Sequence, residues 1–281
     1  MLQPCVFLYG AWLLLEAAKV GQLNVIAPTH LRPVPFTSIA LRCPSTSVLA
    51  SNPDMHSQTV QIDPLDSPHP VPWNWVLANL TESSSTGIVK TRYYRSQSLV
   101  SPDGEYAAYS RIQMQAKPDF VQSRVSSVLF VENLKTGNVQ SISATSPFSE
   151  NSLPTAEGEQ RGGMIAILIP VGWTKTGDRL LAREFESLFG SDIASDYAVI
   201  WHRDTNRVNT LAPSHIHYTN AVLLGWSQAH PDRVLFRAGI LGEETWPLWT
   251  VDLSGQTTRA LGDQPQVFGR SVNSALTGPQ P

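Results

Sequence analysis

Short apolar runs recur along the central part of the chain, and each ends at a turn rich in Gly, Asn, Asp or Ser. One half of the recurring unit is a turn followed by an apolar run, at residues 101–109, 174–182 and 227–236. The other half is an apolar run, a hairpin tip and a second short run, and the tips contain Gly137, Asn206 and Gly255. Gly and Asn tolerate the positive φ of a tight hairpin. Each unit therefore predicts a four-stranded antiparallel sheet.

Equivalent positions in the three units are unevenly spaced. Tyr106, Arg179 and Arg233 each follow the turn, and they lie 73 and 54 residues apart. Units of constant length would give equal steps, so the difference predicts insertions. We expect these insertions within the units and between the first two units, at residues 111–126, 185–195, 238–245 and 143–163.

Two short motifs mark the units. The first unit opens with the turn Ser101, Pro102, Asp103, Gly104, and Gly-Trp pairs at residues 172–173 and 225–226 open the later two. These motifs resemble the blades of TolB-type, tryptophan-aspartate-repeat-like β-propellers. Residues 72–269 also resemble an uncharacterised propeller-like family of cyanobacterial hypothetical proteins. Only the first unit carries the full Ser-Pro-Asp-Gly turn.

The resemblance implies an all-β fold, a small or incomplete β-propeller of four-stranded antiparallel blades. Such propellers close with about four or more blades, and three are recognisable here. A degenerate fourth blade could be assembled from residues 76–80 and 266–272. The alternatives are an open arc that a partner completes and a stack of sheets that never closes.

The composition changes on both sides of the repeated units. Pro interleaved with Ser and Thr precedes them without a sustained period, which is typical of a linker. Pro72, which suits the first turn of a helix, stands at the start of the predicted domain. The predicted parts are an apolar N-terminal segment, a Pro/Ser/Thr-rich extension, the propeller domain and a disordered tail, at residues 1–28, 29–71, 72–268 and 269–281.

The apolar run at residues 5–15 raises the question of export. It is shorter than the about 20 residues of a membrane span, and Met1 to Pro4 lack the Lys or Arg that precedes a secretory signal core. These flanks favour the cytoplasm over the periplasm or cell envelope and leave membrane association open. Cys5 and Cys43 are too few for a disulfide framework or a four-thiolate zinc site.

Composition and charge narrow the classes of partner. Charged residues make up 15% of the chain, the formal net charge is -3 and the pI is near 6.2. No broad positive field is therefore expected to attract nucleic acid or anionic lipid. The 20 Lys and Arg are scattered, and the densest run, residues 90–95, alternates with Thr and Tyr. We expect no nucleic-acid partner.

No set of catalytic residues converges in the sequence. The nearest match to Gly-x-Ser-x-Gly is residues 225–229, but Ser227 repeats the place of Thr174 and a strand rather than a helix is expected after it. We interpret Ser227 as the start of a turn. The hydrolase domain that prolyl-oligopeptidase-like enzymes append to such propellers is not recognised after the last unit.

Two acidic pairs and one histidine pair are further candidates. Carboxylates lie close together at Glu157 with Glu159 and at Glu184 with Glu186, as a hydrolase or a calcium site would need. We interpret both pairs as a loop or a solvated face. His215 and His217 are weak metal candidates, because they share one side of an extended segment but need a third ligand. No nucleotide-binding motif appears, so we expect no cofactor and no metal.

The remaining candidates lie in or beside the predicted insertions. Trp246 follows two glutamates, and Tyr218 and Arg237 are its expected neighbours. Loops on one face of a propeller commonly carry its contacts. We therefore expect a non-catalytic scaffold that binds a protein or another ligand through these three residues, or that self-associates. The alternatives are a divergent hydrolase or carbohydrate-active propeller enzyme and an envelope-anchored accessory protein.

Overall fold

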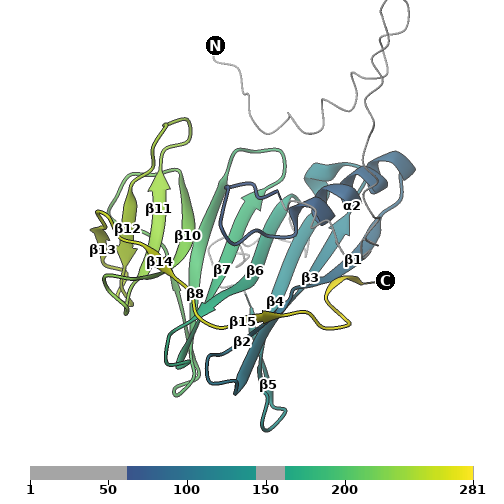
Figure 1. The fold of residues 1–281 in the computed structure, drawn as a ribbon. Coiled ribbons are helices and arrows are strands. Elements are labelled where there is room, and N and C mark those ends of the chain that lie inside the picture. The colour runs from purple at the N-terminus through teal and green to yellow at the C-terminus, as the bar shows by residue number, and fades with distance from the viewer. Residues whose placement is uncertain (1–61, 144–161, 281) are drawn as a thin grey trace, which may run out of the picture. The chain divides into compact units, whose positions relative to one another are not determined.

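The computed structural model describes residues 62–143 and 162–280 (Figure 1). The described residues belong to one compact unit, Gln61–Pro281. The apolar run at residues 5–15, both cysteines, Glu157 and Glu159 lie outside the described residues. No helix in the described part of the chain is long and apolar enough to cross a lipid bilayer.

Each predicted unit forms four antiparallel strands that pair in chain order, and we name these sets the first, second and third meanders. The predicted all-β fold is thus confirmed. The first meander consists of β2 (Ser98–Val100), β3 (Tyr106–Ala116), β4 (Arg124–Asn133) and β5 (Val139–Ser143). The second consists of β6 (Met164–Trp173), β7 (Arg179–Leu188), β8 (Ala194–His202) and β9 (Arg207–Leu211). The third consists of β10 (Asn220–Ser227), β11 (Val234–Gly239), β12 (Leu248–Val251) and β13 (Thr257–Arg259).

The turns form where the sequence predicts them. The hairpin tips hold Gly137, Asn206 and Gly255 at φ of 73°, 53° and 86°. Most side chains are strained in this left-handed region, whereas Gly is free of a Cβ and Asn tolerates it. The Ser-Pro-Asp-Gly turn is closed by a hydrogen bond from Gly104 N to Ser101 O of 2.9 Å.

Two of the predicted insertions are mostly strand. β3 and β4 stay paired as far as Gln115 with Arg124, and β7 and β8 as far as Ser187 with Ala194. The connection between β3 and β4 includes only one short 3-10 helix, η1 (Phe120–Gln122). These two insertions were predicted wrongly as loops. In residues 111–116 of β3 every second side chain is polar and exposed, so the strand was not recognised from its apolar residues. The third insertion is confirmed as a loop, since β11 ends at Gly239 and β12 begins at Leu248.

The first two meanders share one sheet, and the third belongs to a second sheet. β4 pairs with β5 along one half and meets β6 through a parallel bridge between Val125 and Ile165. β1 (Lys90–Arg95) pairs with the outer half of β3. Among the described residues this gives an eleven-stranded and a five-stranded sheet. Three apolar clusters fill the interior, around Ile112 and Phe185, around Leu181 and Phe236, and around Leu129 and Trp173.

Residues 76–80, which were predicted to contribute to a fourth blade, are helical. They lie in α2 (Trp73–Thr86), which begins directly after Pro72. Val76 is fully buried, and Trp73 and Leu80 pack against the same apolar cluster. Apolar residues three and four positions apart suit one face of a helix, whereas a strand would alternate. The predicted fourth blade is therefore wrong, since its second half, residues 266–272, also pairs with strands of the first and third meanders.

The folded unit begins earlier than the predicted start at Pro72. Leu65 and Val71 are buried, and their backbone N–H groups donate to the two carboxylate oxygens of Asp63. The segment at residues 62–71 therefore belongs to the fold rather than to a linker. The sequence did not predict that this segment is ordered. Its backbone N–H groups are hydrogen-bonded by the Asp63 side chain and not by a helix or a strand partner, so the segment has no hydrophobic periodicity.

The predicted disordered tail at residues 269–281 is wrong for its described part. β14 (Pro265–Gln266) pairs with β10, Phe268 bridges to Trp173, β15 (Arg270–Val272) pairs with β2, and β16 (Gly278–Gln280) pairs with β1. We name residues 264–272 the strap. It runs past the first strand of every meander (Figure 1). The strap is ordered because it hydrogen-bonds strand edges that would otherwise be unpaired.

The strap also explains the repeated Gly-Trp pairs. A Cβ at Gly172 would lie 2.8 Å from the Cβ of Val267, and one at Gly225 would lie 3.1 Å from its Cγ1. Val267 therefore fits between the second and third meanders only because both positions are Gly. The neighbouring Trp173 is fully buried, and its Nε1 donates to Leu99 O at 3.2 Å.

Candidate functional site

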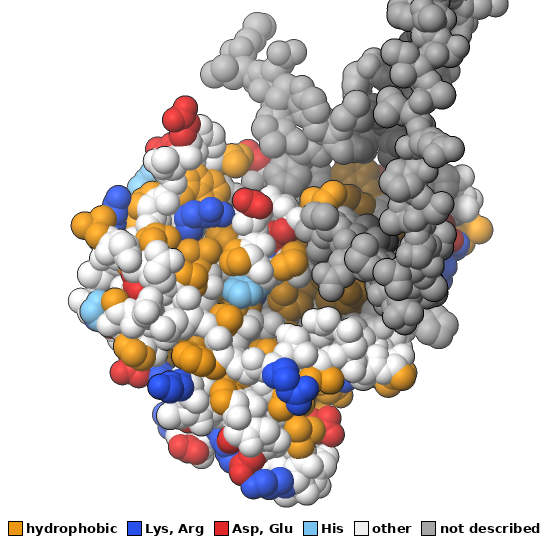
Figure 2. Space-filling model, in the orientation of Figure 1, with side chains coloured by type: hydrophobic (Ala, Val, Ile, Leu, Met, Phe, Trp, Pro, Cys, Tyr) orange, Lys and Arg blue, Asp and Glu red, His pale blue; other side chains and the backbone are white. Residues whose placement is uncertain are grey.

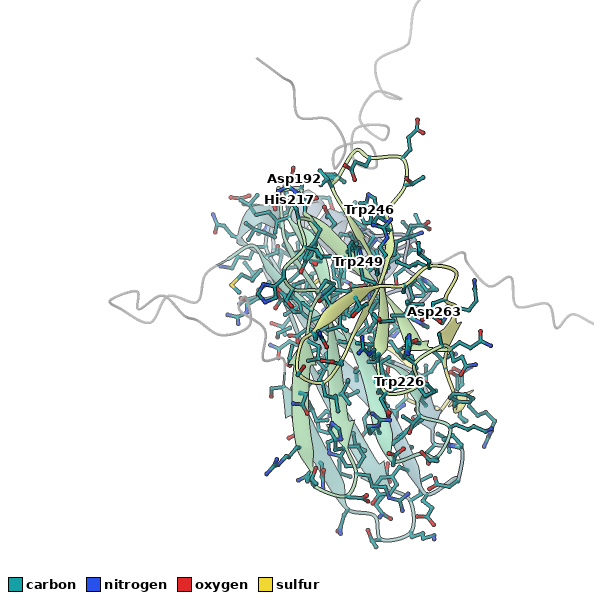
Figure 3. The ribbon with its side chains drawn as sticks, turned by 90° about the vertical axis from the view of Figure 1, so that its left-hand side faces the viewer. Asp192, His217, Trp226, Trp246, Trp249 and Asp263 are labelled. Carbon is teal, nitrogen blue, oxygen red and sulfur yellow. The ribbon has the colours of Figure 1, made fainter. Side chains whose placement is uncertain are left out.

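The loop at residues 240–247 carries Trp246 at one end of the third meander (Figure 3). The indole Nε1 donates to Ile240 O at 3.0 Å. The ring lies over Gly239, where a Cβ would come within 2.5 Å of the indole Cδ1. Trp246 also packs against the apolar cluster that contains Leu65. The side chain is therefore held by its own loop, by β11 and by the core.

Trp246 forms one wall of a surface hollow of about 250 Å³. The other residues that line it are Leu65, Arg237, Glu243 and Glu244. Two of the three residues predicted to contact a partner, Arg237 and Trp246, thus meet at one place. A concave surface with an aromatic wall and a few charged groups is suited to holding one side chain of a partner.

The hollow is lined by two negatively charged side chains and one positively charged side chain. Arg237 is bound to the segment at residues 62–71, because its Nη2 donates to Asp66 O at 3.3 Å. Glu243 accepts a long hydrogen bond of 3.4 Å from Ile240 N, and both Glu243 and Glu244 are exposed. Two carboxylates against one guanidinium leave the mouth negative, so it attracts a cationic group.

A buried ion cluster fixes the segment at residues 62–71, which supplies Leu65 to the hollow. Arg183 on β7 donates from Nε to Asp196 Oδ1 and from Nη1 to Asp63 Oδ2, both at 2.7 Å, and from Nη1 to His69 O at 2.6 Å. Asp196 on β8 accepts from Leu223 N on β10 at 2.9 Å. The side chains of Arg183 and Asp196 are 0% exposed and that of Asp63 is 3% exposed. The cluster therefore joins the segment to the second and third meanders.

Two carboxylates share one guanidinium in this cluster. Burial raises the pKa of Asp196 to about 6, and Arg183 offsets this only in part. Burial opposes the charge on Arg183 as well, but the two carboxylates hold its pKa above the ordinary value. Burial lowers the pKa of His69, which suits a neutral imidazole donating from Nε2 to Leu224 O at 3.0 Å.

The raised pKa of Asp196 gives a pH dependence of known sign. Its pKa is about 6 in the fold and 3.8 ordinarily, so folding takes up a proton between these values. The stability from this group is full below pH 3.8 and is lost as the pH rises through about 6. We expect the free energy of unfolding of the wild type, relative to Asp196→Asn, to fall by up to about 3 kcal/mol over this range.

Urea unfolding of both proteins at several pH values measures this difference. Asp204→Asn, at an exposed hairpin tip, is the control substitution. A difference between wild type and Asp196→Asn that stays constant or rises with pH would contradict the assignment.

Tyr218, the third residue predicted to contact a partner, is not among the residues that line the hollow. Its hydroxyl donates to Pro213 O at 3.1 Å, and its ring packs against the cluster around Leu181 and Phe236. Burial raises the pKa of the Tyr218 hydroxyl. Tyr218 therefore stabilises its own loop. It was expected to lie beside Trp246, but it does not line the hollow with Trp246.

The histidine pair lies on the surface. His215 and His217 are both exposed, and His215 has a φ of 59°. Over residues 62–143 and 162–280, no group of three His, Cys, Asp or Glu side chains is placed to hold a metal ion. The third ligand that this candidate requires is thus not supplied by the described residues.

Ser227 closes a turn, as the sequence indicated. Its Oγ donates to Asp263 Oδ2 at 2.6 Å and accepts from His230 N at 2.8 Å. The equivalent Thr174 hydroxyl donates to Asp178 in the second meander. In the described part of the chain, no imidazole nitrogen is hydrogen-bonded to Ser227 Oγ. Figure 3 shows Asp263 and Trp226 well separated from Trp246.

Glu184 and Glu186 are not on a solvated face, contrary to our interpretation of the sequence. They lie on β7 and are 0% and 1% exposed. Burial, with a smaller effect of Glu186, raises the pKa of Tyr197 on β8 to about 12. Both glutamates take part in further interactions within the fold. They are therefore interior groups.

Sequence reasoning missed the residues that hold the hollow in place. Leu65 and Asp63 were assigned to a linker, and Asp196 was not singled out. Arg183 offered one signal, because it interrupts the apolar residues of a predicted strand, and such an interruption often marks a paired buried charge. Neither the family models nor the curated proteins compared with this chain gave a match.

Proposed function

We propose that this chain is a non-catalytic scaffold that binds a protein partner through the hollow at Trp246. The observation that carries the proposal is the convergence of Arg237, Glu243, Glu244 and Trp246 on one concave surface. Its negative mouth and apolar walls favour a Lys or Arg of the partner. The aliphatic stem would pack on Trp246 and Leu65, while the charged head would face the two glutamates.

We also propose that the three meanders are blades of an incomplete TolB-type propeller. Support comes from three sets of four antiparallel strands in chain order, whose first strands all lie along one strap. Sheets arranged around a common axis would bring their first strands together in this way. An arc of three blades leaves outer faces to which a partner can bind.

The catalytic alternatives have less support. The Ser227 hydroxyl is occupied in its turn, and Glu184 and Glu186 are buried in the fold. The alternative of an envelope-anchored accessory protein rests on residues 1–28, which lie outside the described residues.

Quantitative capture tests the proposal. The full chain is immobilised and exposed to a lysate of its native cells, and bound proteins are compared with those on Trp246→Ala and on Glu243→Lys/Glu244→Lys. Asp204→Lys, which reverses an exposed charge on a distant hairpin, is the matched control. We expect a partner that the control retains and both site variants lose by roughly tenfold or more.

Binding must then be reproduced with the purified partner. The proposal fails if the same proteins bind all four forms equally, because the hollow would then contribute nothing. It also fails if the purified chain turns over a substrate and loses that activity when one residue of the hollow is changed.

A further inference from the structure

The outer face of the first meander gathers residues that are distant in the sequence. Along β3, Ile112 and Met114 are buried, while the alternating residues Arg111, Gln113 and Gln115 are exposed. The register places further side chains of β1 and β4 on this exposed face. We name these residues the arginine face, which comprises Tyr93, Arg95, Tyr109, Arg111, Gln113, Gln115, Arg124, Ser126 and Phe130.

Three arginines carry the positive charge of the arginine face, and one carboxylate, Glu132, lies on the same side of β4 beyond Phe130, opposite Ala107. Arg95 and Arg111 lie directly opposite each other on β1 and β3, an arrangement of like charges that costs stability. Arg124, on β4 opposite Gln115, has an Nη1 that is buried and without a hydrogen-bond partner among the described residues. Arg95 donates to the neutral hydroxyls of Ser98 and Ser274, so the positive charge of the group remains and attracts an anionic ligand.

Aromatic rings accompany these cations. Tyr93 is 40% exposed and lies opposite Gln113. Tyr109 and Phe130 stack with centroids 5.5 Å apart, and the Arg95 guanidinium lies 3.9 Å above the Tyr109 ring. A polar hollow of about 200 Å³ lies beside them, lined by Gln113, Gln115, Arg124 and Ser126.

We propose that the arginine face binds single-stranded nucleic acid. Phosphates would meet Arg111 and Arg124, a base would stack on Tyr93, and the amides of Gln113 and Gln115 would hydrogen-bond base edges. An acidic polypeptide would satisfy the arginines but would use neither the ring nor the amides. From Tyr109 to Gln115 the face spans six strand steps, about 20 Å, so it holds roughly three nucleotides and binds weakly.

The arginine face could not be recognised from the sequence. Arg95, Arg111 and Arg124 are separated by more than ten residues along the chain, so no basic run marks them. The acidic net charge also argued against a nucleic-acid partner. Strand pairing places Arg95 directly opposite Arg111 and places Arg124 on the neighbouring strand, four residues further along β3. Their local field can act at contact distance despite the net charge.

Fluorescence anisotropy with the full chain tests the proposal. The probe is a fluorescein-labelled oligothymidylate about 15 nucleotides long. We expect Arg111→Gln/Arg124→Gln to weaken binding about tenfold or more, and Tyr93→Ser to weaken it about tenfold while Tyr93→Phe retains it. Arg92→Gln is the matched control, because Arg92 is on the same strand but lies opposite the buried Met114.

The dependence on salt gives a second readout. Two neutralised phosphates, at Arg111 and Arg124, predict a slope of log K against log salt of about −1.4, and each arginine removed should reduce its magnitude by about 0.7. The proposal is overturned if no binding occurs at about 1 mM protein, or if Arg92→Gln weakens binding as much as the face variants. Equal competition by a polyglutamate peptide, with no effect of Tyr93→Ser, would indicate an acidic protein ligand instead and would also overturn it.

Discussion

Removal of residues 264–281 is expected to make the chain self-associate or aggregate. The strap and β16 pair with β10, β6, β2 and β1, so their loss would expose unpaired edges in all three meanders at once. Such edges template pairing with other chains. The truncation keeps Asp263, which caps Ser227, so the third meander retains its turn. Light scattering on the purified protein measures the effect, and a monomer with an unchanged thermal midpoint would contradict it.

A pair of glycine substitutions isolates the strap without deleting it. Gly269 has a φ of 108°, and a Cβ there would lie 2.7 Å from Val100 O. Gly262 has a φ of 73° and open space around it. Both Ala variants carry the cost of a left-handed backbone, about 1–2 kcal/mol. Only Gly269→Ala adds a clash, so we expect it to lose about 1–3 kcal/mol more.

Arg183→Met is expected to destabilise the fold by about 3–5 kcal/mol. The substitution leaves Asp63 and Asp196 buried without their cation. Because the free energy of unfolding of a domain is only about 5–15 kcal/mol, the expected loss is a large fraction of the total stability. Urea unfolding monitored by tryptophan fluorescence measures the loss. Arg207→Met, at an exposed position of β9, is the control and should change stability by less than about 0.5 kcal/mol.

The double variant Arg183→Met/Asp196→Asn separates the cause. If the loss comes from uncompensated carboxylates, removing one of them should restore part of the stability. A loss for Arg183→Met no larger than that of the Arg207→Met control would show that the cluster does not hold the segment at residues 62–71.

The candidate site was predicted in part. Arg237 and Trp246 were identified from their place beside an insertion, and the structure brings them to one hollow. Leu65 and the Arg183 cluster were not, because Asp63 and Arg183 are 120 residues apart and their pairing has no local signature. Tyr218 was grouped with them on the basis of loop position alone, and packing places it elsewhere.

The tail shows the same limit. Composition indicated a disordered tail after residue 268, yet β15 and β16 are ordered by edges that other strands provide. Residues 76–80 are different, because the local spacing of Trp73, Val76 and Leu80 by itself fits one face of a helix.

The sequence by itself determined the three meanders. Side-chain alternation and the φ preferences of Gly and Asn act within a few residues, so strands, turns and hairpin tips could be located without knowledge of the fold. The tertiary structure alone decided the course of the strap, the burial of Arg183 with two carboxylates, and the grouping of Arg95, Arg111 and Arg124. These depend on hydrogen-bonded edges and packed faces that form only when segments distant in the chain meet, and no local pattern encodes such encounters.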